Sequence, residues 1–264
     1  MHILKWEIKA QFKTLLIWSV VFIVLIFMMT SEFSAYYDNP EMSDVLEAMP
    51  EGMLKAFSME NANLTTTTGY ISLVALYFYI MVGVYAVLLG NGIIAKEERD
   101  KTAEFLLTLP VSRRKLLFIK WLAALINTIL LSLVIFAATT AAMQPYDLDQ
   151  AFFKFLTQIT VSCFIIMLIF LSIGYLMASV LKRYKSSGKL SAVLVFFLYL
   201  ANDIMALSDK LEFMKYLTPF KYFEAQKILK EGSLDTTYLI ISGGIVIVSM
   251  ITAFIIYPKR DIKI

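Results

Sequence analysis

Between Lys96 and Lys115 the chain reads KEERDKTAEFLLTLPVSRRK, a charged stretch that separates two long apolar segments. We call residues 96–115 the charged segment. Three carboxylates stand near its start, where they favour the positive end of a helix dipole. Pro110 predicts the end of this helix because the residue before a proline disfavours the α region, and Ser112 is a suitable N-cap for the next helix. A simple connection needs no such order, so the pattern predicts a surface that docks a partner.

The rest of the chain has the composition of a membrane protein. Its 264 residues are 59% hydrophobic and only 17% charged, whereas soluble domains are nearer half apolar and a quarter charged. Apolar runs of about twenty residues recur, and each is long enough to cross a bilayer. We expect one all-α transmembrane domain over residues 1–264. Its six spans are predicted at 15–30, 70–94, 116–143, 152–181, 190–207 and 238–257.

The distribution of Lys and Arg predicts how these spans are oriented, because basic residues favour the cytoplasmic side. With the N-terminus inside, 17 of the 24 basic residues fall on the inner side and 15 of the 21 acidic residues on the outer side. An even number of spans then places both termini and the charged segment in the cytoplasm. The first apolar run lacks a small-residue cleavage site, so we expect no removable signal peptide.

Two segments flank the first span. Residues 1–14 predict an amphipathic elbow helix in the inner interface, which turns sharply into the span; the alternative is a positively flanked start of the span itself. Residues 31–68 predict an acidic outer loop with two short helices on either side of a turn at Pro50-Glu51-Gly52. We interpret this loop as a structural cap over the outer ends of the spans.

Residues 208–237 are expected outside and are rich in aromatic side chains. Thr218 predicts the N-cap of a 13-residue helix, and Gly232 predicts its end. Thirteen residues cannot span a bilayer, so the helix is expected to lie in the outer interface or to re-enter the membrane. The aromatic residues anchor this region or form an outer gate; the gate candidates are Phe213, Tyr216, Phe220, Tyr222 and Phe223.

The sequence holds no recognisable catalytic, cofactor-binding or metal site. Its single histidine, His2, and single cysteine, Cys163, cannot form a common zinc site or a Ser/His/Asp triad. Gly188-Lys189 lacks the preceding glycine and following hydroxyl residue of a phosphate-binding loop. We expect Cys163 to fill space in a buried position.

The predicted spans contain few charges, although an ion or proton path would require them. Lys120 and Lys154 lie near span ends and are expected to snorkel toward the interface. Neutral polar side chains are expected to hydrogen-bond between helices; they are Asn91, Asn127, Thr128, Ser132, Gln158, Thr160, Ser162 and Ser172. A transport protein of this kind would take its energy from a partner.

The charged segment resembles the signature of ABC-2-type permeases, the membrane subunits of a large class of ATP-driven exporters. The family has an acidic start, a Thr-x-Glu-x-Leu-Leu core and a Pro-x-Ser-Arg exit, which here are Glu97-Glu98, residues 102–107 and residues 110–113. Many members have glycine where this chain has Lys101. The span count, the elbow helix and the aromatic stretch at 217–223 are also similar, so the resemblance covers nearly the whole chain.

This resemblance implies half of a transmembrane pore that pairs with a second copy or a paralogue and with two ABC ATP-binding subunits. ATP and Mg would be bound by those subunits, and this chain would be no enzyme. Residues 96–113 would form the coupling helix and its hinge; the coupling residues would be Glu97, Glu98, Arg99, Thr102, Glu104, Phe105, Leu109, Pro110, Ser112 and Arg113. The expected location is a bacterial cell membrane, and no nucleic-acid partner is expected.

Few charges and many methionines in the spans favour amphipathic or hydrophobic cargo. Among small bacterial members, the chain is most similar to permeases of peptide exporters, such as those for phenol-soluble modulins. Permeases for sodium extrusion or antibiotic-peptide resistance are also similar and stay open as alternatives. Two other classes stay open as well: a secondary transporter that uses Asp203 as its buried acid, and a membrane scaffold or sensor that docks a non-ATPase protein on the charged segment.

Overall fold

The computed structural model describes residues 2–39, 63–102, 111–181, 184–206 and 215–259. These residues form helices and turns without a β-strand. The long helices are α1 (His2–Phe33), α4 (Thr67–Arg99), α6 (Arg113–Met143), α7 (Gln150–Val180), α8 (Tyr184–Ala206) and α11 (Thr236–Ile256). The short elements are α9 (Pro219–Tyr222), α10 (Ala225–Glu231) and the 3-10 turn η2 (Tyr257–Lys259).

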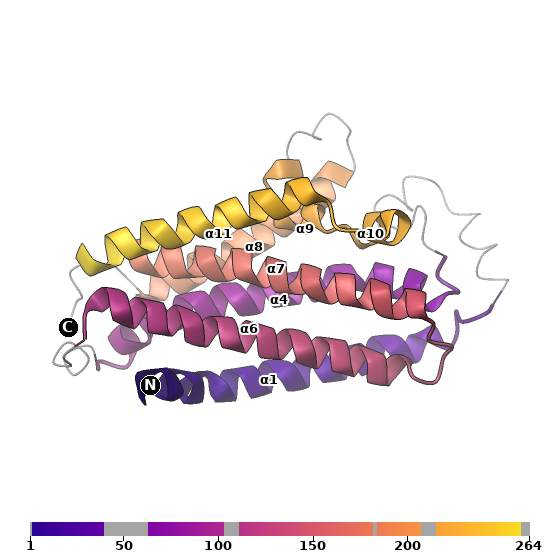
Figure 1. The fold of residues 1–264 in the computed structure, drawn as a ribbon, viewed down its shortest axis with the longest axis horizontal. Helices are drawn as coiled ribbons and strands as arrows, with labels where there is room; N and C mark the ends of the chain where they lie inside the picture. Colours follow the sequence, from indigo (N-terminus) through magenta and orange to yellow (C-terminus); the bar gives the residue numbers. More distant parts are fainter. Residues whose placement is uncertain (1, 40–62, 103–110, 182–183, 207–214, 260–264) are drawn as a thin grey trace.

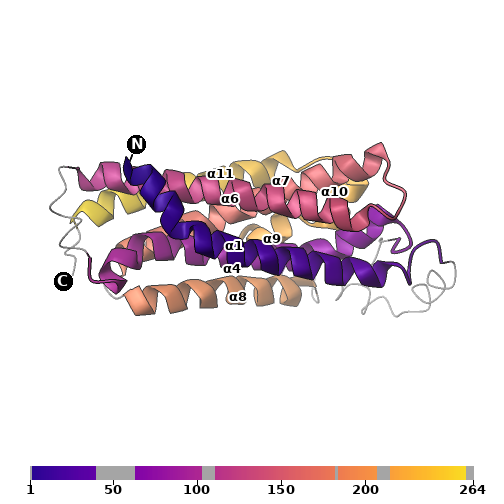
Figure 2. The same ribbon diagram turned by 90° about the horizontal axis from the view of Figure 1, so that it is seen from below.

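The long helices lie side by side in an elongated bundle, with consecutive helices running in opposite directions (Figures 1 and 2). The start of α1 and the end of α11 lie at the same end (Figure 1). α4 and α7 form the centre; α6 covers α7 on one side and carries α1, while α11 and α8 lie on the other side. We call the end that holds the start of α1 the basic end, for the charges described below.

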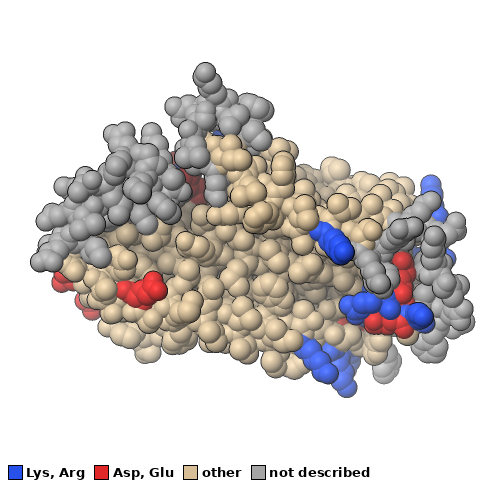
Figure 3. All heavy atoms as spheres, turned by 180° about the vertical axis from the view of Figure 1, so that it is seen from behind, with Lys and Arg blue, Asp and Glu red and all other residues tan. Residues whose placement is uncertain are grey.

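Five of these helices, α1, α4, α6, α7 and α11, are long and apolar enough to cross a membrane. The chain is therefore a multi-pass membrane protein. The sixth predicted span, 190–207, falls on α8, whose described apolar part is shorter. Figure 3 shows the charge pattern on one face: Lys and Arg gather at the basic end, beside some acidic residues, and acidic residues are visible at the opposite end.

The N-terminal prediction was wrong in one respect. The elbow predicted at residues 1–14 is not a separate helix, because α1 runs without a break from His2 to Phe33. Its first part does run at an angle to the rest, as Figure 2 shows. Most of the outer loop, including its predicted turn at residues 50–52, lies outside the described residues.

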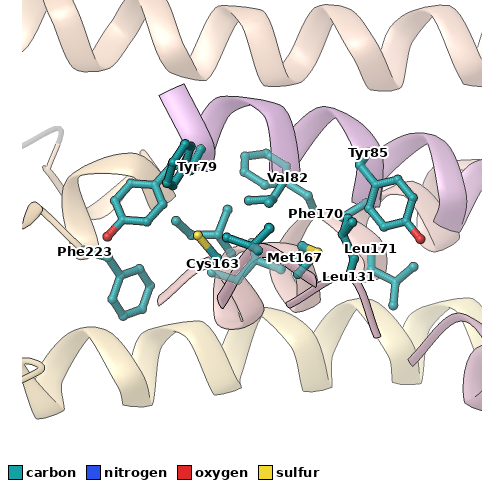
Figure 4. Close-up of a cluster of buried hydrophobic side chains, with 14 of the residues drawn as sticks. Tyr79, Val82, Tyr85, Leu131, Cys163, Met167, Phe170, Leu171 and Phe223 are labelled. Carbon is teal, nitrogen blue, oxygen red and sulfur yellow. The ribbon is translucent and has the colours of Figure 1, made fainter. Parts of the chain in front are cut away.

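The closest helix contact joins α4 and α7 and depends on two glycines. A Cβ added at Gly90 would lie 2.2 Å from the carbonyl oxygen of Leu171, and one added at Gly174 would lie 2.2 Å from the carbonyl oxygen of Val87. Lipid chains are as apolar as the helices, so helices associate through close packing at such small residues. Tyr79, Tyr85, Phe170 and the free Cys163 are buried around this contact (Figure 4).

Two of the eight neutral polar residues donate hydrogen bonds to another element, as predicted. The Asn91 amide donates to the Ser187 hydroxyl of α8, and the Gln158 amide donates to the Gly232 carbonyl over 2.6 Å. The others donate to carbonyls of their own helix, because a side chain three or four residues along reaches the preceding turn. They are Asn127, Thr128, Ser132, Thr160, Ser162 and Ser172.

Gly174→Ala is expected to lower the thermal stability of the purified protein, because the new methyl group must push α7 away from Val87. Overpacking of this kind costs about 1–3 kcal/mol. Gly243→Ala on α11 is the matched control, since a Cβ there meets nothing within 4 Å. Thermal unfolding in detergent measures both variants, and an equal effect of the two would contradict the role of the close contact.

Candidate functional site

Four charged side chains from three helices meet at the basic end, and two of them belong to the charged segment. We call Glu7 of α1, Lys96 and Glu97 of α4, and Lys120 of α6 the ionic cluster. Their residues are between 0% and 6% exposed. Among the described residues, these are the charged residues that are buried. Two carboxylates and two ammonium groups make the set neutral, as buried charges require.

The distances show how the ionic cluster joins the helices. Lys120 Nζ lies 2.5 Å from Glu97 Oε1 and 3.4 Å from Glu7 Oε1, and it donates to the Ile93 carbonyl over 2.6 Å. Lys96 Nζ lies 2.5 Å from Glu7 Oε2 and 3.9 Å from Glu97 Oε1. The Lys96 ammonium also lies 4.0 Å from the centroid of the Trp6 ring. Each carboxylate therefore faces both ammonium groups, which ties α1, α4 and α6 together.

This cluster corrects two interpretations of the sequence. Glu97 was expected at the head of a separate cytosolic helix, but it lies in the last two turns of α4 and is 4% exposed. Lys120 was expected to snorkel outward, but its amine points inward to the carboxylates. Glu7 had no predicted role. One signal was present: Glu7 falls next to Ile8 and one turn from Leu4, on the apolar face of its helix.

The charged segment leaves α4 through a tight helix end. Asp100 is the C-cap, and Lys101 takes the left-handed conformation with φ of 55°. The Thr102 amide then donates to the Glu97 carbonyl over 2.9 Å, which is the 6→1 hydrogen bond of a Schellman motif. Glycine is favoured at this left-handed position because it has no Cβ.

The charged segment enters α6 at a second fixed end. The Ser112 hydroxyl accepts a hydrogen bond from the Lys115 amide over 3.3 Å, so Ser112 is the N-cap as predicted. Arg113 begins α6, and its guanidinium donates to the Pro258 carbonyl in η2 over 3.3 Å. The segment is thereby attached to α6 and to the end of α11.

The other predicted coupling residues divide into two groups. Glu98 and Arg99 lie in the last turn of α4, and Arg99 Nε lies 2.9 Å from Asp100 Oδ1. This hydrogen bond to Arg99 lowers the pKa of the Asp100 carboxyl. The remaining positions, Glu104, Phe105, Leu109 and Pro110, lie outside the described residues.

Of the five gate candidates, Phe213 lies outside the described residues. Phe220 and Tyr222 lie in α9, Phe223 follows it, and Tyr216 precedes it. Phe220, Tyr222 and Phe223 are buried, whereas Tyr216 is exposed. The predicted 13-residue helix is divided into two: α9 ends at Tyr222, and α10 begins at Ala225. Thr218 stands at the N-cap position, but its hydroxyl donates to the Leu198 carbonyl of α8 over 3.0 Å and makes no cap. Gly232 ends α10 in the left-handed conformation, as predicted.

The buried aromatic rings connect α9 to three of the long helices. The Phe220 ring centroid lies 5.4 Å from that of Phe170 in α7 and 6.4 Å from that of Tyr199 in α8. Tyr222 stacks on Tyr238 of α11 with centroids 4.9 Å apart, and its hydroxyl donates to the Tyr216 carbonyl. Burial raises the pKa of Tyr222 to about 12. The rings therefore pack α9 against α7, α8 and α11.

Lys120→Met is expected to destabilise the protein by about 3–5 kcal/mol, because Glu7 and Glu97 would then share one buried ammonium. Adding Glu97→Gln makes the cluster neutral again and should restore more than half of the lost stability. Lys115→Met, at an exposed position early in α6, is the control. Thermal unfolding of the wild type, of these three variants and of Glu97→Gln alone tests this, and additive losses in the double variant would contradict the pairing.

The chain was compared with known proteins and with protein families. No curated protein matches the chain. Residues 1–262 match the model of a family described as ABC-2 family transporter protein. Members of this family are the transmembrane components of ABC transporters, generally not catalytic, and the family implies an ABC ATP-binding partner. Because the match covers almost every residue, the chain belongs to the ABC-2 transporter family and is a membrane permease of an ABC transporter.

Proposed function

We propose that this chain is the permease half of an ATP-driven exporter and that its charged segment is where a separate ATPase subunit acts. The observation that carries the proposal is the ionic cluster. It ties α1, α4 and α6 together at the point where the charged segment leaves α4 and enters α6. A displacement of the charged segment would then move α1, α4 and α6 together and would not only bend the end of one helix.

The proposed pathway of movement follows the contacts. One end of the charged segment is fixed to α4 by the turn at Lys101, and the other is fixed to α6 and η2 by Ser112 and Arg113. ATP-driven closure of two ATPase subunits would rock two permease halves against each other. Coupling of this kind requires one element with two states that both the ATPase and the cargo path influence. We propose residues 97–113 as that element.

We further propose that α8 is the sixth span and that the basic end faces the cytoplasm of a bacterial cell. The Lys and Arg side chains at that end support this orientation. Phe220, Tyr222 and Phe223 would then close the outer end as a gate. Among the described residues, buried charge is confined to the ionic cluster, which is neutral. This favours amphipathic or hydrophobic cargo, with peptides as the proposed class, over ions.

Charge reversal in the charged segment tests the coupling proposal. In the complex with its ATPase subunit, Glu98→Lys with Glu104→Lys is expected to lower permease-stimulated ATP hydrolysis by about fivefold or more. Glu231→Lys, at the other end of the molecule, should leave this rate unchanged. Both variants must first be shown to fold. Glu231→Lys should bind the ATPase as the wild type does, and the double variant is compared at an ATPase concentration that saturates it. Full stimulation after residues 102–109 are replaced by a neutral linker would sink the proposal.

Thiol labelling tests the orientation. Cys163 is buried, so the wild-type chain should react little with a membrane-impermeant reagent. Ser233→Cys, in the exposed turn between α10 and α11, is expected to react in intact cells. Lys115→Cys should react only after the membrane is made permeable. The opposite pattern would reverse the orientation, and labelling of both in intact cells would show that the basic end is not cytoplasmic.

A further inference from the structure

A groove lies between α1 and α4, at the basic end. α1 packs along α6 and touches α4 only sparsely, which leaves a cavity of about 350 Å³ between them. This volume is within the range of small-molecule sites, about 300–1,000 Å³. We call this cavity the α1–α4 groove.

The α1–α4 groove has two chemically different ends. Its inner part is lined by Trp18, Leu88 and Leu89, which are apolar or aromatic. Its mouth is lined by Trp6, Lys96, Arg99 and Asp100, and the polar Gln11 and Thr14 lie between the two ends. Ten residues of α4 separate Leu89 from Arg99, a rise of about 15 Å along the helix. This length and this change from apolar to charged match an acyl chain below a polar headgroup.

Charge at the mouth selects the kind of headgroup. Asp100 is paired with Arg99, and the ionic cluster behind the groove is neutral. The exposed Lys5, Lys9 and Lys13 follow one another at one-turn spacing on α1, so a positive excess flanks the groove. Basic residues near the inner surface of a membrane attract anionic lipids. Trp6 lies at the same level and suits the interface.

We propose that the α1–α4 groove binds one anionic phospholipid of the inner leaflet. An acyl chain lies along Trp18 and Leu88, and the phosphate lies beside Arg99 and the lysines of α1. The lipid fills the space that α1 leaves open and completes its packing against α4. This inference rests on the orientation given under the proposed function, but not on the cargo or on the action of the ATPase.

Gly92 provides a variant that fills the groove without disturbing the fold. It lines the α1–α4 groove, and a Cβ added there meets nothing within 4 Å. Leucine also has a higher helix propensity than glycine. Gly92→Leu should therefore fold and occupy the place of the acyl chain. Gly243→Leu on α11 is the matched control, because a Cβ there also meets nothing within 4 Å.

The full-length protein, purified in mild detergent, is washed free of loose lipid and incubated with phosphatidylglycerol or phosphatidylcholine. Native mass spectrometry then counts bound lipid. Wild type and Gly243→Leu are expected to retain one phosphatidylglycerol per chain, and Gly92→Leu to retain at least fivefold less. Arg99→Gln, which leaves Asp100 without this cation, is expected to bind the two lipids equally.

Several outcomes would overturn the inference. Equal retention by Gly92→Leu and wild type would place the lipid elsewhere, and equal binding of both lipids to wild type would remove the anionic selectivity. Retention of an amphipathic peptide in place of lipid would make the groove a cargo site. Lipid counting needs no ATPase, so failure of the coupling proposal leaves this result standing. Loss of lipid binding with full ATPase stimulation would refute only the present inference.

Discussion

The Lys120 ammonium is the interaction on which the basic end of the structure depends. It lies in an apolar helix, is 1% exposed, donates hydrogen bonds to Glu97 and the Ile93 carbonyl, and forms an ion pair with Glu7 over 3.4 Å. A buried ammonium without such partners would lose its hydration with no compensation. The lysine therefore requires both carboxylates to be present, and those carboxylates belong to two other helices. Three helices must assemble before this charge is stable.

The helices of the bundle are held together by two different kinds of contact. α4 is held against α7 by glycine-mediated backbone contact, which permits little sliding. α1 is held mainly at its beginning, by Glu7, and along its length by α6. The helix pair α1 and α6 can therefore move as a unit against the α4–α7 centre only if the ionic cluster tolerates the movement.

Much of the fold could be predicted from the sequence, because hydrophobic runs of this length have few alternatives in a membrane protein. Each predicted span lies on a helix, and Ser112 and Gly232 mark helix ends as expected. The ionic cluster could not be predicted in this way. Glu7, Glu97 and Lys120 come from distant parts of the chain, and periodicity reports which face a residue occupies but not which helix it meets. Thr218 is a similar case, since its hydroxyl bonds to α8 and does not cap its own helix.

Lys101 shows how local and tertiary constraints meet at the charged segment. A residue with a Cβ in the left-handed conformation costs about 1 kcal/mol relative to glycine. The turn nevertheless forms, because the Thr102 amide reaches the Glu97 carbonyl while the Glu97 side chain is fixed by Lys120. Glu97 thus connects the turn at Lys101 to the ionic cluster. Its backbone carbonyl accepts the hydrogen bond of the turn, and its side chain belongs to the cluster. A displacement of the segment at Thr102 must then move Glu97, and Glu97 cannot move without Lys120. For this reason the turn at Lys101 and the ionic cluster must move together, because the backbone of α4 at Glu97 connects them.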